Sequence, residues 1–154
     1  MATKGLLVLA ILVTLSADAG PAFPQNQYPF AASTKERARG YENRCIADLR
    51  LLGTAQGTYA GQFPDKGYAR RLNELGPTGD YLIGWELADG KADGYRFVLT
   101  PKPTHGAVEH YTIRATPIKR FATDQQSFFT DETGVIRATH EKRSAGPKDP
   151  PIDQ

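Results

Sequence analysis

The stretch that decides the fold is residues 33–63, which read STKERARGYENRCIADLRLLGTAQGTYAGQF. Ser33 and Glu36 have the spacing of a capping box, in which the serine side chain accepts from a backbone N–H and the glutamate reaches back to the cap. One stripe of mostly apolar side chains then recurs at heptad spacing: Ala38, Tyr41, Cys45, Leu49, Leu52, Gln56, Tyr59 and Phe63. This pattern predicts an amphipathic helix of about 25 residues that ends near Gly61.

The helix needs a surface to pack on, and the residues after it supply one. Gly40, Gly53 and Gly57 each cost such a helix up to about 1 kcal/mol relative to alanine, so its stability depends on tertiary packing. Residues 68–75 and 81–88 are each long enough for a short helix, closed by Gly-Pro and Asp-Gly pairs.

From residue 94 onward the period changes from helical to alternating. Alternation over residues 95–99 and 111–116 predicts two strands, and residues 127–130 and 134–139 predict a hairpin around a short link that contains Gly134. We therefore expect an α+β domain in which the long helix lies across one face of a three- to four-stranded antiparallel sheet.

The two ends of the chain differ from the middle. Residues 1–19 combine a basic start at Lys4, an apolar run from residue 6 to 15, and small residues at Ala17 and Ala19. This is the pattern of a secretory signal peptide, so we expect cleavage before Gly20 and a periplasmic or secreted protein without a membrane anchor. Residues 20–33 are predicted to be a linker, residues 34–139 the domain, and residues 140–154 a disordered tail rich in charge and proline.

Composition favours one ordinary globular domain and names no partner. The 154 residues are 40% hydrophobic and 23% charged, with a net charge of +2. That charge is too small to indicate a nucleic-acid partner. With a single cysteine, Cys45, the chain forms no internal disulfide, and its place on the helical stripe predicts a buried, unpaired thiol.

Two groups of residues are candidates for a metal site. His105, Glu109 and His110 are close in sequence, but the first falls in a predicted turn and the other two alternate on a strand. Asp131 and Glu132, with a further carboxylate at residue 124, are better interpreted as turn residues of the predicted hairpin than as calcium ligands. We therefore expect no metal, no cofactor and no catalytic residue, and the protein is predicted not to be an enzyme.

A set of tyrosines and arginines is a candidate for protein recognition, because both residue types are favoured in interfaces. The set comprises Tyr41, Tyr68, Arg70 and Arg71. The sequence equally allows the tyrosines to complete the rim of the core.

The middle of the chain resembles the globular domain of type IV pilins and type II secretion pseudopilins. The matching pieces, in order along the chain, are residues 45–59, 72–77, 94–97, 111–117 and 128–137. The resemblance implies a pilin-like fold and an accessory or interaction role in a pilus or secretion system. In that family an N-terminal apolar helix of some twenty residues forms the spine of the filament, with Phe and Glu at the first and fifth mature positions. If a leader ended at Gly5, Leu6 and Ala10 would stand at those two positions, and the apolar run ends by residue 15. The spine is therefore missing.

Without the spine, the resemblance implies a monomer that acts by docking onto a protein partner. The alternative is a small exported ligand-binding protein or enzyme that shares only the layer architecture.

Overall fold

The structure is a computed structural model that describes residues 33–152. The predicted signal peptide, residues 1–19, and the linker up to residue 32 lie outside the described residues. Helix α1 spans Thr34–Gln62 and begins at the predicted capping box. The Ser33 side chain accepts from the Glu36 backbone N–H at 3.2 Å, and the Glu36 carboxylate accepts from the Ser33 N–H at 2.7 Å. The helix ends where the Phe63 N–H bonds to the Tyr59 carbonyl, just before Pro64.

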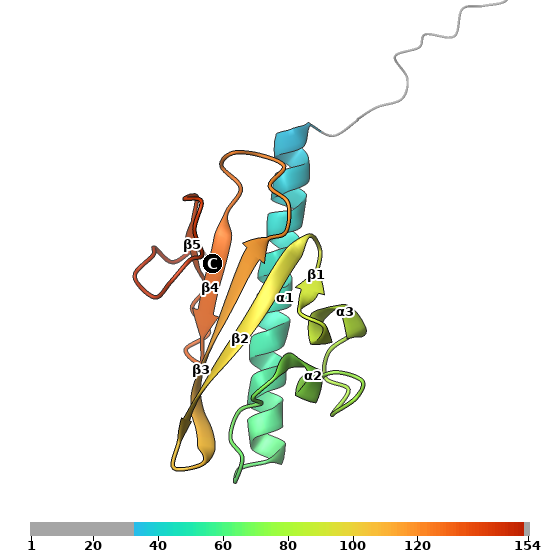
Figure 1. Cartoon of the computed structure of the whole chain (residues 1–154), viewed down its shortest axis with the longest axis vertical. Helices are drawn as coiled ribbons and strands as arrows, with labels where there is room; N and C mark the ends of the chain where they lie inside the picture. The colour runs from blue at the N-terminus through green and yellow to red at the C-terminus, as the bar shows by residue number, and fades with distance from the viewer. Residues whose placement is uncertain (1–32, 153–154) are drawn as a thin grey trace, which may run out of the picture. The chain divides into compact units, whose positions relative to one another are not determined.

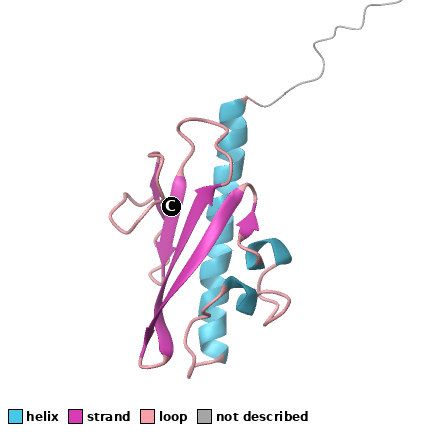
Figure 2. Cartoon of the chain, viewed as in Figure 1, coloured by secondary structure: helices cyan, strands magenta, loops and turns pink. Residues whose placement is uncertain are grey.

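Within residues 33–152, five strands form one antiparallel sheet in the order β1-β2-β3-β4-β5, which is a simple meander (Figures 1 and 2). The strands are β1 (Lys91–Ala92), β2 (Tyr95–Thr104), β3 (Ala107–Pro117), β4 (Ser127–Asp131) and β5 (Arg137–Thr139). Two short helices, α2 (Leu72–Leu75) and α3 (Trp85–Ala88), connect α1 to β1. The α+β class, the long helix, the antiparallel sheet and the predicted hairpin are confirmed.

The core lies between α1 and one face of the sheet. The stripe predicted on the helix is the buried face of α1, and Cys45, Leu49 and Leu52 are each at most 1% exposed. Register places Ala115 opposite Phe128, and Phe128 opposite Ala138, all facing the helix. The stripe is therefore covered by the sheet of the same chain.

The prediction of three to four strands is wrong because it omits β1. Asp93 and Gly94 both adopt positive φ, 46° and 77°, which closes a two-residue hairpin between β1 and β2. A two-residue strand has no readable alternation, and the Asp-Gly pair was the signal that could have revealed it.

Both short helices are shorter than predicted. The first was expected from Tyr68, but the Tyr68 N–H donates to the Val108 carbonyl at 2.9 Å, so the chain is extended there. The second was expected from Tyr81, whose φ is 57°, a left-handed conformation outside any helix.

The prediction of a disordered tail from residue 140 is wrong for the residues that the structure describes. The Ala138 N–H donates to the Pro150 carbonyl at 3.1 Å, and the Ile152 N–H donates to the Ile136 carbonyl at 3.0 Å. Ala145 is 1% exposed. The Arg143 guanidinium holds both oxygens of the Asp149 carboxylate, and that pairing, with a bond from the Gly146 N–H, lowers the pKa of Asp149 to about 2. Residues 140–152 are therefore held in place by backbone hydrogen bonds and one bidentate ion pair, although they contain no run of apolar residues.

The C-terminal segment also lies near the outer face of the sheet. Phe129 points away from α1, as do its register partners Arg114 and Arg137, yet it is 1% exposed. The Arg114 guanidinium lies 5.6 Å from the centre of its ring, and Pro147 lines the same hollow as Phe129. Among the described residues, no helix is long and apolar enough to span a bilayer.

Candidate functional site

The four residues of the predicted recognition set do not form one patch. Tyr41 lies near the start of α1, where it stacks on Phe121 at a centroid distance of 5.1 Å. The Arg44 guanidinium lies 5.1 Å from the centre of the same ring. Tyr41 therefore packs at the rim of the core, as the second interpretation of the sequence holds.

Tyr68, Arg70 and Arg71 lie at the opposite end of α1. Tyr59, which shares a pocket with Tyr68 and Arg70, is 18 residues from Tyr41, or about 27 Å along the helix. The Tyr68 ring packs edge-on against Tyr111 at 4.8 Å, so this tyrosine is also part of the core rim. Arg70 and Arg71 are exposed, so of the set only these two arginines and the edge of Tyr68 remain for a partner.

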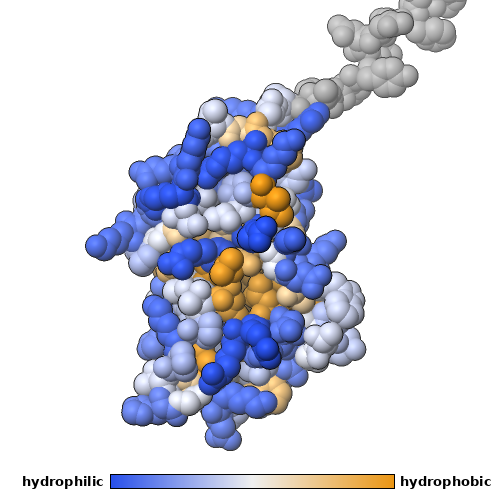
Figure 3. All heavy atoms as spheres, viewed as in Figure 1, coloured by the Kyte–Doolittle hydropathy of each residue, from blue (hydrophilic) through white to orange (hydrophobic). Residues whose placement is uncertain are grey.

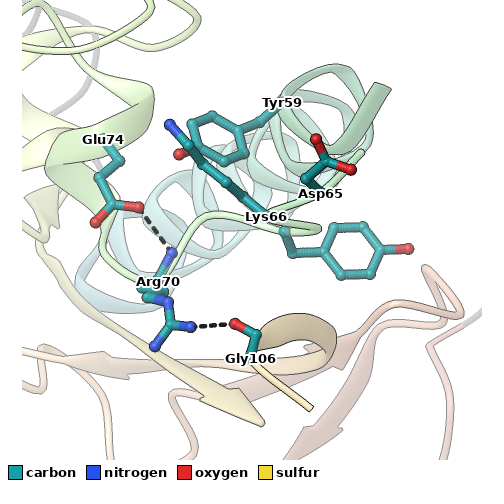
Figure 4. A pocket seen from close by; sticks show the side chains of 7 residues that line it. Tyr59, Asp65, Lys66, Arg70, Glu74 and Gly106 are labelled. Atoms are coloured by element: carbon teal, nitrogen blue, oxygen red, sulfur yellow. Dashed lines mark hydrogen bonds between the residues drawn. The ribbon is translucent and has the colours of Figure 1, made fainter. Parts of the chain in front are cut away.

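The pocket at this end of α1 has a volume of about 400 Å³. Figure 4 shows Arg70 between Glu74 and Gly106, with Tyr59 and Lys66 across the hollow. The lining comes from the end of α1, the segment after it, α2 and the turn between β2 and β3: Tyr59, Asp65, Lys66, Tyr68, Arg70, Glu74 and Gly106.

A buried glutamine positions the segment that lines this pocket. Gln56 is 0% exposed, and its side-chain amide bonds to both backbone groups of Ala69. The Ala69 N–H donates to Gln56 Oε1 at 2.8 Å, and Gln56 Nε2 donates to the Ala69 carbonyl at 3.3 Å. The side chain thus pairs with the backbone as a strand does, which explains a polar residue on the apolar stripe.

Charges of both signs face the pocket. The Glu74 carboxylate accepts from the Arg70 backbone N–H at 2.9 Å and from Arg71 Nε at 3.1 Å. The Arg70 guanidinium donates to the Gly106 carbonyl. Burial, together with the nearby carboxylates of Glu74 and Asp80, raises the pKa of the Tyr59 phenol, which therefore stays protonated at neutral pH. The hollow offers donors and acceptors to a small polar group, and its lining contains no Ser, Cys or His.

Cys45 is buried and unpaired, as predicted from the helical stripe. Burial, with smaller contributions from nearby carboxylates, raises the pKa of its thiol well above the ordinary range. Because the thiolate is the reactive form, this side chain is a small core residue with little nucleophilic character.

His105 and His110, two of the candidate metal ligands, lie in different surroundings. His105 lies in the turn between β2 and β3 with a φ of 48°, as expected. His110 pairs instead with Glu132 at 2.7 Å, and Glu132 also accepts from the Tyr111 N–H at 3.3 Å. In the segments that the structure describes, no group of three or more His, Cys, Asp and Glu side chains is placed to hold a metal ion.

One of the two hairpin carboxylates stabilises the turn itself, and the other bonds to residues of the neighbouring strand β3. Asp131 Oδ1 accepts from the Thr133 backbone N–H at 3.1 Å, which is an Asx turn, and Glu132 makes the bonds described above. The third carboxylate of that set, Asp124, is exposed, and its carbonyl lies 2.7 Å from His140 Nδ1.

Helix α1 also carries a partly buried carboxylate, Asp48, with one oxygen that accepts no hydrogen bond. Within the described residues Asp48 Oδ2 is buried and has no hydrogen-bond partner. Burial, and then the neighbouring carboxylates of Asp93 and Glu86, raise the pKa of Asp48 to about 6 against an opposing effect of Arg44. Arg44 is itself paired with Asp93 at 2.9 Å.

Sequence reasoning missed the two most exposed aromatic side chains. Tyr81 is 78% exposed and Trp85 is 61% exposed, and both belong to the segment between α2 and the first turn of α3. The left-handed φ of Tyr81 costs a bulky residue about 1–2 kcal/mol, where Gly or Asn adopts it at lower cost. In Figure 3 the surface over α2 and α3 is largely pale, the colour of residues with intermediate hydropathy.

Comparison with protein-family models, with curated proteins and with solved structures finds no match for this chain.

Proposed function

We propose that this chain is an exported, non-catalytic, pilin-like module that docks onto a component of a type IV pilus or a type II secretion system. The observation that carries the proposal is the order and layering of the elements. One long helix is followed by two short helices and an antiparallel meander, and the helix buries its apolar stripe against that meander. This is the arrangement that the pilin resemblance of the sequence implies.

The surface chemistry supports a docking role over catalysis. The lining of the pocket at the end of α1 contains no Ser, Cys or His, the side chains that most often act as nucleophile or base in catalysis. Cys45 is buried on the core side of α1. Binding through exposed side chains is therefore the activity that the described residues support best.

Export and processing are tested by the mass of the protein recovered from the periplasm or the medium. The proposal expects a mature chain that begins at Gly20. A chain that begins at Leu6 would restore the interpretation as a prepilin, and an uncut chain in the cytoplasm would contradict export.

The docking role is tested by purifying the tagged protein from cells of its own species after chemical cross-linking. We expect a pilus or secretion subunit among the cross-linked proteins. Cross-links only to metabolic enzymes would favour the alternative of a small binding protein or enzyme.

A further inference from the structure

The outer face of the sheet, which points away from α1, carries rows of basic side chains. Tyr95 and Phe97 of β2 are buried in the core. Arg96 and Val98 alternate with them, so both point outward, where they are exposed. Lys91 of β1 is the register partner of Arg96 and lies on the same side of the sheet. Two cations thus stand opposite each other on paired strands, and their mutual repulsion opposes folding.

The next row across the sheet adds two arginines. Register pairs Val98 with Arg114, and Arg114 in turn with Phe129. Phe129 pairs with Arg137, so this row crosses the four strands β2 to β5 (Figure 1). The Arg137 guanidinium donates to the backbone carbonyl of Asp149 at 3.0 Å, which is a neutral partner. The two rows are about 7 Å apart, the separation of alternate residues along a strand.

The basic residues of these rows are not neutralised by ion pairs. In residues 33–152 no ion pair involves any of the four. Arg120 adds a further cation, because its guanidinium donates to the hydroxyl of Ser127, which lies on the outer side of β4, at 3.3 Å. Near β5, the Asp149 carboxylate is held by Arg143. This part of the face therefore carries a surplus of positive charge.

The surplus ends at two margins where carboxylates are present. Toward the turn between β2 and β3, one hollow is lined by two cations and two carboxylates, which are Lys102, Arg114, Asp131 and Glu132. At the open edge of β2, the Asp89 carboxylate lines a second hollow together with Arg70 and Arg71. The basic area is thus bounded by regions of mixed charge.

Two aliphatic side chains are exposed among the cations. Val98 is 48% exposed and Ile118 is 53% exposed. The Ile118 N–H donates to the Gly94 carbonyl at 2.9 Å, which continues the register of β3 along β2 and places Ile118 on the same side as Arg96. Cations that attract anionic headgroups, combined with apolar side chains that enter the interface, are the features that hold a protein on an anionic membrane.

We propose that this basic sheet face, defined by Lys91, Arg96, Val98, Arg114, Ile118 and Arg137, binds the surface of a membrane that contains anionic phospholipid. The five strands span about 19 Å, wide enough for the cations to meet several headgroups at once. The one aromatic side chain of the two rows, Phe129, is 1% exposed, so the face offers no stacking platform for the bases of a nucleic acid. The inference goes beyond the proposed function, because docking onto a pilus or secretion subunit does not require it.

Co-sedimentation with lipid vesicles tests the proposal on the mature protein. The probes are vesicles of phosphatidylcholine alone and vesicles of phosphatidylcholine with about one third phosphatidylglycerol, which is anionic. We expect the protein to sediment with the anionic vesicles and to stay in solution with the neutral ones. Raising the salt concentration from about 0.1 M to about 0.5 M should release most of the bound protein.

Variants separate this face from the charge of the whole protein. Lys91→Gln with Arg96→Gln removes two exposed cations that repel each other, so the variant should fold as well as the wild type. Its affinity for the anionic vesicles should fall about 25-fold, since each basic residue near such a surface contributes about fivefold. Val98→Ser should weaken binding severalfold. The matched control, Arg39→Gln with Arg50→Gln, removes two exposed cations of α1 and should change the affinity less than about twofold.

Equal binding to neutral and anionic vesicles, or an equal loss in the control variant, would overturn the inference. Absence of vesicle binding would also overturn it. If a peptide of alternating glycine and glutamate then binds with the same dependence on Lys91 and Arg96, the face recognises an acidic protein segment instead. All these results would leave the proposed function standing, because export and cross-linking to a pilus or secretion subunit test it separately.

Discussion

Gln56→Leu tests whether the buried amide holds the segment after α1 in place. Leucine has a similar volume and keeps the helical stripe apolar, but it removes both partners of the Ala69 backbone. Ala69 is 0% exposed, so its N–H and carbonyl are left without a partner in the interior. Each unsatisfied buried group costs about 1–3 kcal/mol.

The hydrogen bond from the Ala69 N–H to Gln56 is 2.8 Å long, close to ideal, whereas the one from Gln56 to the Ala69 carbonyl is long at 3.3 Å. Loss of the hydrogen bond to the carbonyl should therefore cost close to 1 kcal/mol, the low end of the range. We therefore expect Gln56→Leu to lower the free energy of unfolding by about 3 kcal/mol. In urea, where the slope for a small domain is about 1–3 kcal/mol per molar, the midpoint should fall by about 1–3 M.

Urea unfolding followed by Trp85 fluorescence and far-ultraviolet circular dichroism measures the change. Gln62→Leu is the matched control, because this glutamine is exposed at the end of the same helix. The control should stay within about 0.5 kcal/mol of the wild type. A Gln56→Leu protein as stable as the control would refute the reasoning, since water or a shifted backbone must then satisfy Ala69.

Three further predictions concern the core, a carboxylate and assembly. Cys45 should react slowly with a thiol reagent in the native protein and quickly after denaturation, and Cys45→Ala should cost about 1 kcal/mol in urea unfolding; fast labelling of the folded protein contradicts burial. Because folding raises the pKa of Asp48 to about 6, the folded state favours its protonated form, and the free energy of unfolding should fall as pH rises from about 4 to about 6. Asp48→Asn should remove this pH dependence and stabilise the protein by about 1 kcal/mol at pH 8, whereas an unchanged pH dependence in the variant contradicts the assignment. Light scattering over a wide concentration range, with electron microscopy of the same samples, should show a monomer without filaments, because the chain's own sheet covers the apolar stripe of α1. A stable oligomer at micromolar concentration contradicts this prediction.

The long helix and most of the sheet could be predicted because their signals are local. The capping box at Ser33 and the heptad stripe specify where α1 begins and which face it buries, and the alternation in β2 and β3 specifies the strands. Gln56 was placed on the stripe by spacing, but its partner Ala69 is set by the path of the chain after the helix, which spacing does not reveal.

The C-terminal segment and the surface of the molecule depend on contacts between distant residues. The pair of Arg143 and Asp149, and the backbone bonds of residues 150 and 152 to the strand edge, leave no periodic pattern in the sequence. Tyr41 was grouped with Tyr68 by residue type, whereas the length of α1 separates them. Trp85 was missed because exposure is decided by which side of a short, anchored segment faces the core.

Photo-cross-linking in living cells can show whether this chain docks onto a pilus or secretion system. A photoreactive phenylalanine analogue replaces Trp85, which is 61% exposed at the start of α3, and in a control strain it replaces Val98, which is 48% exposed on the outer face of the sheet. We predict that position 85, and not position 98, cross-links to a pilus or type II secretion subunit. Equal cross-linking at both positions, or the absence of any such subunit among the products of position 85, would contradict it.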